Sequence, residues 1–343
     1  MKEGDPRMDR VARSLLAANK IWITTHVKAD GDGIGSELAL VRALRRMGKE
    51  VFIINDTQVP RALRFLMGDT EIATYDPTLH DARIDGADTI VVLDVGLTYR
   101  LGRLEAPFLR SGAVKICVDH HLETDSDFDP ALTDCRATST GEILFGLLKR
   151  MNAPMTRDVA IPLYASISVD SGNFSYERCT PNTFHTAAAL VAAGADPYWI
   201  HLNLNWKRPM TEVKFDGEVI NRLRVESNGE IAHSEVTQDM LRRYHIDPME
   251  IPTVVNIPLS IEGVEIALLF VELEPLHIKV SARSKGRVQV SELAKRFGGG
   301  GHPLAAGFSV GASLDEARTR VLSEARMLIE RAAQDCTTAS GPV

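Results

Sequence analysis

Four short apolar runs, rich in β-branched residues, alternate with helical patterns along the first half of this chain. The runs are IWITT at 21–25, VFIIN at 51–55, TIVVLD at 89–94 and VKICVD at 114–119. Segments between them, such as SELALVRALRRMG at 36–48, repeat apolar residues at helical spacing. Strands that alternate with helices form mostly parallel sheets with helices on both faces. The first half is therefore predicted to be an α/β domain of that kind.

The second half of the chain has a different pattern. Its strand candidates lie close together at 231–237, 264–273 and 277–283, and an amphipathic helix is predicted at 314–333. A chain of 343 residues also exceeds what one compact core usually supports. We therefore expect three parts: the α/β domain at 10–190, a helical connector at 191–220 and a smaller mixed α/β domain at 221–335.

Charge and composition exclude several classes of protein. A formal net charge of −7 argues against a protein that coats long nucleic acid, because such binding neutralises many phosphates with Lys and Arg. A small phosphorylated substrate remains compatible with that charge. The sequence has neither an apolar stretch that could cross a bilayer nor the apolar core of a signal peptide, so we expect a cytoplasmic protein without a membrane partner. The four scattered cysteines form no CxxC pair and are predicted to be reduced thiols.

Acidic and imidazole side chains follow three of the four predicted strands. They are His26, Asp30 and Asp32 after the first, Asp94 at the end of the third, and Asp119, His120 and His121 at the end of the fourth. Ligands of open α/β sheets bind at that edge, where loops from neighbouring strands converge. Crowded carboxylates repel one another unless a cation neutralises them. The pattern therefore predicts a metal site, with enough ligands for two ions.

Each cluster alone has a simpler interpretation. Asp30 to Gly33 could be a tight turn in the predicted loop before a helix, and an Asp there often caps the helix. A histidine pair often just packs or caps. Three such clusters at successive strand ends favour the metal site over these separate explanations. Asp oxygen and His nitrogen without thiolate suit Mn, Fe, Co or Zn better than Ca or a Cys-rich zinc site.

Four consecutive glycines, at 298–301, precede His302 near the C-terminus. Glycines let a backbone approach a ligand closely and present amide groups to a phosphate, although a turn before a strand would also use them. No Lys-Ser/Thr follows, so the segment is not a Walker loop. The imidazole of His302 and the guanidinium of Arg283 suit a phosphate or a base.

Together these residues resemble the motifs of the DHH phosphoesterase superfamily. The resemblance is carried by HVKADGD at 26–32, VVLD ending at Asp94, DHH at 119–121 and SISVDSGNF at 166–174. RFGGGGHPLAAGF at 296–308 resembles the signature of the DHH-associated substrate-binding domain. The motifs cover roughly residues 10 to 335 and are most similar to those of enzymes that hydrolyse both short RNA and 3′-phosphoadenosine-5′-phosphate.

The resemblance implies two divalent metal ions, with manganese expected. His26 and Asp30 would hold one ion, Asp32, His120 and Asp170 the other, and Asp94 would bridge both. Asp119 would orient the neighbouring imidazole, and His121 would face the scissile phosphate. In the second domain the implied substrate-binding positions are Arg283, His302, Gly299, Gly300 and Gly301, with Ser281 and Lys285 as weaker candidates.

The predicted function is hydrolysis of short oligoribonucleotides (nanoRNA) and 3′-phosphoadenosine-5′-phosphate (pAp). A phosphodiesterase for cyclic dinucleotides or their linear products uses the same motifs and remains an alternative. So does a noncatalytic nucleotide sensor, which the filled ligand positions disfavour. A processive single-strand exonuclease would need an extended basic groove, which a short acidic chain does not suggest. The sequence does not set the oligomeric state, and a homodimer is one arrangement that it allows.

Overall fold

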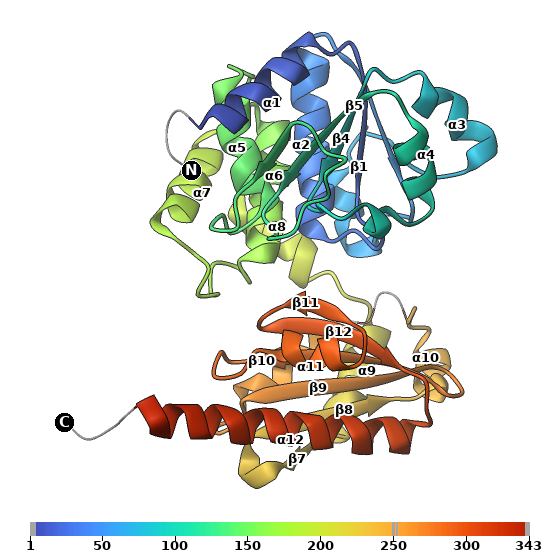
Figure 1. The fold of residues 1–343 in the computed structure, drawn as a ribbon, viewed down its shortest axis with the longest axis vertical. Coiled ribbons are helices and arrows are strands. Elements are labelled where there is room, and N and C mark those ends of the chain that lie inside the picture. Colours follow the sequence, from blue (N-terminus) through green and yellow to red (C-terminus); the bar gives the residue numbers. More distant parts are fainter. Residues whose placement is uncertain (1–4, 249–250, 252, 340–343) are drawn as a thin grey trace. The chain divides into compact units, whose positions relative to one another are not determined.

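The structure, a computed structural model, describes residues 5–248, 251 and 253–339, and of residues 335–339 only the helical backbone. The chain divides between Lys207 and Arg208 into two compact units (Figure 1). Each unit has its own six-stranded sheet. The predicted fold class, a parallel α/β domain followed by a mixed α/β domain, is confirmed.

The sheet of the N-terminal unit is parallel throughout, with strand order β3-β2-β1-β4-β5-β6. Its strands are β1 Lys20–Thr25, β2 Glu50–Asn55, β3 Ile72–Thr74, β4 Thr89–Leu93, β5 Val114–Asp119 and β6 Ala131–Thr133. The four strands expected from the apolar runs are present. The two outermost strands were not predicted, because three residues are too few to show a periodicity.

Helices cover both faces of this sheet. They are α1 Pro6–Ala17, α2 Gly31–Arg46, α3 Pro77–Asp85, α4 Glu105–Arg110, α5 Thr140–Arg150, α6 Arg157–Asp170, α7 Pro181–Ala192 and α8 Pro197–Asn205, with 3-10 turns at Arg61–Leu66 and Thr98–Leu104. Alternate residues of β1 enter two separate cores: Ile21 and Ile23 pack with α2, α5 and α6, whereas Trp22 packs with α3 and α4 on the other face. Burial on both faces explains why the strands are apolar without alternation.

Helix α2 begins earlier than the pattern at 36–48 indicated. Asp30 Oδ1 accepts hydrogen bonds from the amides of Asp32 and Gly33, at 2.9 and 3.3 Å, and so caps the helix. The expectation that Asp30 to Gly33 lie in a loop before the helix is therefore wrong in part, since Asp32 lies in the first helical turn.

The sheet of the C-terminal unit has the order β11-β12-β10-β9-β8-β7. Only β8 and β9 run parallel, and the other pairs are antiparallel. The strands are β7 Arg224–Glu226, β8 Ile231–Val236, β9 Ile266–Glu274, β10 His277–Ser284, β11 Gly300–His302 and β12 Ala305–Val310. Its helices are α9 Met210–Asn221, α10 Gln238–Tyr244, α11 Val290–Arg296 and α12 Leu314–Ala339, with 3-10 turns at Ser227–Gly229 and Thr253–Ser260. Helices α11 and α12 cover one face, and α9 and α10 pack on the other.

None of the helices in the described part of the chain combines the length and the apolar composition needed to cross a membrane. The cysteines with described side chains, Cys117, Cys135 and Cys179, are free thiols, as the lack of a CxxC pair predicted. Cys336 lies outside the described side chains.

Candidate metal centre

The predicted ligands of the N-terminal unit converge at one edge of its sheet, at the carboxyl ends of β1, β4 and β5. His26 follows β1, and Asp94 follows β4. Asp119 ends β5 and is followed by His120. Asp170, which was expected only from the family resemblance, reaches the same place as the last residue of α6.

His26 lies between Asp94 and Asp30. Its Nε2 atom is 3.4 Å from Asp94 Oδ2, and its Nδ1 atom donates a hydrogen bond to the Val27 carbonyl at 2.9 Å. A carbonyl can only accept, so this bond fixes the proton on Nδ1 and directs Nε2 toward the carboxylates. Ligand atoms of His26, Asp30 and Asp94 all lie within 4.8 Å of one another.

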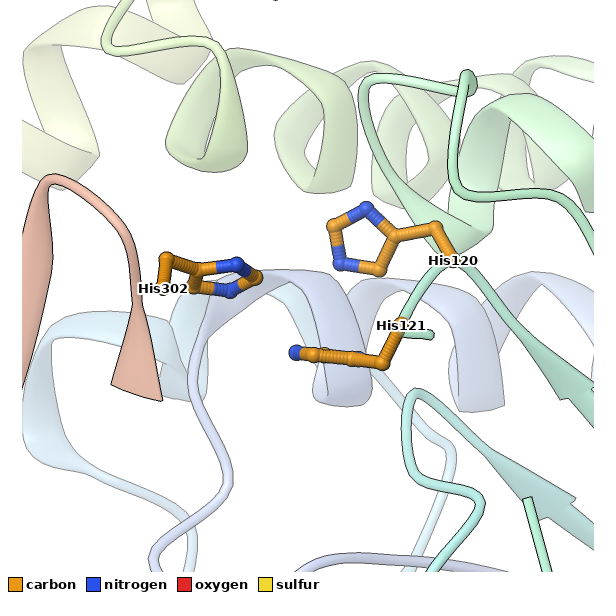
Figure 2. A group of neighbouring side chains, drawn as sticks. All are labelled: His120, His121 and His302. Atoms are coloured by element: carbon orange, nitrogen blue, oxygen red, sulfur yellow. The ribbon is translucent and has the colours of Figure 1, made fainter. Parts of the chain in front are cut away.

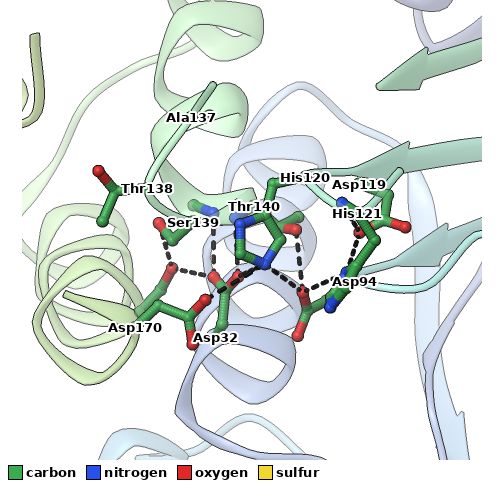
Figure 3. Close-up of polar contacts among 12 residues, drawn as sticks. Asp32, Asp94, Asp119, His120, His121, Ala137, Thr138, Ser139, Thr140 and Asp170 are labelled. Atoms are coloured by element: carbon green, nitrogen blue, oxygen red, sulfur yellow. Dashed lines mark hydrogen bonds and ion pairs between the residues drawn. The ribbon is translucent and has the colours of Figure 1, made fainter. Parts of the chain in front are cut away.

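A second group contains His120, Asp32 and Asp170 (Figure 3). His120 Nε2 is 3.2 Å from Asp170 Oδ2 and 3.7 Å from Asp32 Oδ2. The same nitrogen is 3.4 Å from Asp94 Oδ1. Asp94 therefore faces both groups, with Oδ2 toward His26 and Oδ1 toward His120.

The backbone at Asp94 has a left-handed conformation, with φ 62°. Its amide donates to the Val118 carbonyl at 3.0 Å, and Thr140 Oγ1 donates to its Oδ1 at 3.2 Å. Burial would raise the pKa of Asp94, but the hydrogen bonds and charges of His120 and His26 outweigh it and hold the pKa well below its usual range.

Asp32 is fully buried and accepts several hydrogen bonds. The amides of Thr140 and Gly141, at the start of α5, donate to its two oxygens at 2.7 and 3.1 Å. Hydroxyl groups of Ser166 and Ser36 donate to Oδ1 as well. A Cβ atom on Gly141 would lie 2.0 Å from Ser166 Oγ, so only glycine fits there. Nothing in the sequence around Thr140 and Gly141 indicated that their amides bind Asp32.

The remaining carboxylates are held too close together for all to be charged without a counter-ion. Burial, together with the charges of Asp94 and Asp170, raises the pKa of Asp32 well above its usual range. Burial and the charges of Asp30 and Asp94 raise the pKa of Asp170 to about 8. A divalent cation in each ligand group would remove this repulsion, and Asp oxygens with His nitrogens are suitable ligands for it.

Asp119 contacts the imidazole and the backbone of His121. Its Oδ1 atom accepts from His121 Nδ1 at 2.7 Å and from the His121 amide at 3.1 Å. The rings of His120 and His121 meet edge to face, with centroids 4.6 Å apart (Figure 2). His121 Nδ1 is also 3.8 Å from Asp94 Oδ1. The imidazole that Asp119 orients is thus the one expected to face the phosphate.

His120 has a different partner on its Nδ1 side. Arg178 Nη2 lies 2.9 Å from His120 Nδ1. No motif or periodicity pointed to this arginine, which lies between α6 and α7.

In the C-terminal unit, strand register places Arg283 and His302 on one face of the sheet. His302 pairs with Ala305, and Ala305 pairs with Arg283. Directly paired residues point to the same side, so the two polar side chains are separated by one small residue, about 10 Å across two strand spacings. Ser281 shares this face one pair further along, opposite Gly307.

The glycine run is part of an edge strand as well as a turn. A Cβ on Gly299 would lie 2.4 Å from Phe308 Cβ, and one on Gly301 would lie 2.6 Å from the Ala305 carbonyl. Packing against β12 therefore accounts for these two glycines, whereas a Cβ on Gly300 would meet nothing within 4 Å. Lys285 lies beyond β10, where its Nζ donates to the Ile261 carbonyl at 3.1 Å.

Both units match families of known proteins. Residues 20–167 match the DHH family, N-terminal domain, and residues 228–331 match the DHHA1 domain. The chain is 30% identical to the bifunctional oligoribonuclease and PAP phosphatase NrnA of Thermus thermophilus, over 95% of each sequence. The protein of the same name from Bacillus subtilis is 27% identical, over 92% of this chain and 96% of the relative. The crystal structure of an exopolyphosphatase-related protein from Bacteroides fragilis matches with a TM-score of 0.89 and 27% identity, over 95% of this chain and 98% of the other.

Both domain matches occur in the order that the motifs predicted, and one relative matches nearly the whole chain. This chain therefore belongs to the DHH phosphoesterase family and is a hydrolase that acts on phosphoester bonds.

Proposed function

We propose that this hydrolase cleaves short oligoribonucleotides and pAp with two divalent metal ions. The observation that carries the proposal is the position of Asp94, whose two oxygens face His26 and His120 at 3.4 Å each. One carboxylate thus joins two ligand groups. The names of the Thermus and Bacillus relatives support the substrate class.

The ligand groups divide naturally around Asp94. His26 and Asp30 would hold one ion, and Asp32, His120 and Asp170 would hold the other. Manganese is the ion we expect, since it accepts this mixture of oxygen and nitrogen. Two ions that shared Asp94 would supply an activated water and would neutralise phosphoryl oxygens.

His121 is suited to handle a proton near the scissile phosphate. Its Nδ1 atom is fixed by the bond to Asp119, which is fully buried. A ring held in this way can take up or release a proton at Nε2 without turning. Asp119 therefore positions the ring, and His121 exchanges the proton.

The C-terminal unit selects substrate in this proposal. Arg283 and His302 can bind a phosphate or a base on their shared face, and the backbone at Gly300 leaves room for a ligand. We accordingly assign catalysis to the domain at 10–190 and substrate selection to the domain at 221–335. The backbone of Gly299 and Gly301 supports the strand, while Ser281 and Lys285 are secondary contacts.

A turnover panel tests the function. We expect metal-free protein to leave a radiolabelled RNA dinucleotide and pAp intact, and added manganese to restore hydrolysis of both. The same panel includes a cyclic dinucleotide and its linear product. Hydrolysis of the cyclic compound alone would favour the alternative phosphodiesterase activity, and binding of all four without turnover would favour a sensor.

Manganese binding should release protons. Burial would lower the pKa of His26, but Asp94 and Asp30 outweigh it and raise the pKa to about 9. The metal-free ring is therefore charged at pH 7. Its ion pairs stabilise the metal-free fold fully below pH 6.5, the usual pKa of histidine, and this stabilisation is lost as the pH rises through about 9. A metal ion must displace this proton from His26. It must also displace a proton from Asp170, because the pKa of that carboxyl group is about 8.

Affinity for manganese should consequently rise about tenfold or more per pH unit between pH 6.5 and 8. Calorimetric titrations in buffers with different ionisation enthalpies measure both the affinity and the number of protons released. An affinity that is the same at pH 6.5 and 8 contradicts this ligand set.

A further inference from the structure

We propose that Arg178 binds a phosphate group of the substrate and gives up its bond to His120 when it does so. Arg178 lies in the segment that connects Asp170, at the end of α6, to the start of α7. The proposal deepens the proposed function and rests on it. Four observations in the N-terminal unit support it.

The guanidinium lies directly beside the second ligand group. Arg178 Nη2 is 2.9 Å from His120 Nδ1 and 3.4 Å from the Ala137 carbonyl. Its charge also acts on Asp170, whose carboxylate is 3.2 Å from the other nitrogen of the same ring. A phosphate held at the ligand group would therefore lie within reach of this side chain.

His120 cannot accept the bond from Arg178 at Nδ1 and bind a metal ion through Nε2 at the same time. A guanidinium can only donate, so His120 Nδ1 can be its acceptor only while that nitrogen carries no proton. A ring that binds a cation through Nε2 carries its proton on Nδ1 instead, which then needs an acceptor. In that form of the site Arg178 must point its donors elsewhere, while the Ala137 carbonyl remains nearby as an acceptor.

The backbone that carries Arg178 is firmly held, so only the side chain has to move. Its carbonyl accepts a hydrogen bond from Thr138 Oγ1 at 2.9 Å. Thr138 is bonded in turn to Thr183, at 2.7 Å, and Thr183 forms a capping box with Thr180 at the start of α7. Such anchoring reduces the entropy lost when the guanidinium binds a ligand.

Charge balance favours a phosphate as the new partner. The four ligand carboxylates, Asp30, Asp32, Asp94 and Asp170, carry four negative charges, which two divalent ions neutralise. A bound substrate phosphate would then leave the site with net negative charge even while the ions contact its oxygens, and a positive side chain would offset that charge. The planar guanidinium of Arg178 matches the geometry of phosphate oxygens and supplies that positive charge.

The test compares Arg178→Gln and Arg178→Lys with Arg150→Gln. Arg150 ends α5 and pairs with Asp9 on the surface, so its variant loses the same charge away from the ligands. Two equilibrium titrations are measured on each protein: manganese without phosphate, and inorganic phosphate with saturating manganese. Inorganic phosphate is the smallest molecule that carries the recognised group, and it needs no turnover. KM and kcat for pAp follow on the same preparations, with circular dichroism as the check on folding.

We expect Arg178→Gln to weaken phosphate binding and raise KM roughly ten- to a hundredfold, because a charge-assisted bond is lost. Arg178→Lys should lose less, and Arg150→Gln should match wild type. Manganese affinity of Arg178→Gln should equal or exceed that of wild type, since a donor that competes for His120 is gone.

Unchanged phosphate affinity in both Arg178 variants overturns the proposal. So does a lower manganese affinity with unchanged phosphate binding, which would mean that Arg178 only orients His120. Wild-type protein that binds no phosphate with saturating manganese overturns it too. Wild-type protein that binds phosphate but hydrolyses none of the nucleotides refutes the proposed function alone, because the phosphate titration still decides the role of Arg178.

Discussion

Replacing Asp94 by asparagine is expected to reduce turnover at least about a thousandfold, which corresponds to about 4 kcal/mol of transition-state stabilisation. The carboxylate faces His26 with one oxygen and His120 with the other, so one substitution weakens both ligand groups. An amide keeps one oxygen but brings no charge. The loss should therefore appear with pAp and with short RNA alike.

Asn is the substitution that best separates charge from fold at this position. Asp94 has φ 62°, and asparagine tolerates this left-handed conformation better than most residues. The hydrogen bond that Thr140 Oγ1 donates to Oδ1 also remains possible. We expect a circular dichroism spectrum like that of wild type.

A matched control is Asp85→Asn. Asp85 is the last residue of α3, and its exposed carboxylate pairs with Arg110. The variant should hydrolyse both substrates at the wild-type rate. Hydrolysis rates, metal content and circular dichroism are measured on the three proteins together. A well-folded Asp94→Asn protein with near-normal activity would show that Asp94 does not join the two groups.

The positions of His26, Asp94 and His120 in the candidate site were predictable because they follow from the order of the strands in the sheet. Once β1, β4 and β5 are recognised as neighbouring parallel strands, His26, Asp94 and His120 must meet at their carboxyl ends. The strands themselves could be predicted from the sequence because burial on both faces makes them apolar throughout. Asp170 has no such local signal, since it ends a helix, and only the family resemblance pointed to it.

Contacts between distant segments were not predictable. Asp32 and the Thr140 amide are 108 positions apart, and Arg178 and His120 are 58 apart. Such pairs depend on how α5 and α6 pack over the sheet, which no local periodicity encodes. The short edge strands were missed for a related reason, because β11 consists of two glycines and a histidine, a composition with low strand propensity.

The C-terminal unit offers a second large effect, since Arg283→Ala should reduce nucleotide hydrolysis efficiency roughly ten- to a hundredfold. Arg283 points to the same face of β10 as Ser281, away from the core residue Ala282. In the proposed function its guanidinium acts on substrate, and the proposed ligand groups around Asp94 lie in the N-terminal unit. Efficiency is measured with pAp and with a small artificial phosphodiester that has no nucleotide to grip.

The comparison between the two substrates decides what Arg283 does. If it selects nucleotides, pAp hydrolysis falls while hydrolysis of the artificial phosphodiester changes little, because the catalytic groups keep their charge. Arg287→Ala is the matched control: this exposed neighbour pairs with Glu230, and its loss should affect neither substrate. Equal losses on both substrates in Arg283→Ala would mean that the arginine supports the fold, because a side chain that contacts only nucleotides cannot slow the hydrolysis of a compound that lacks one.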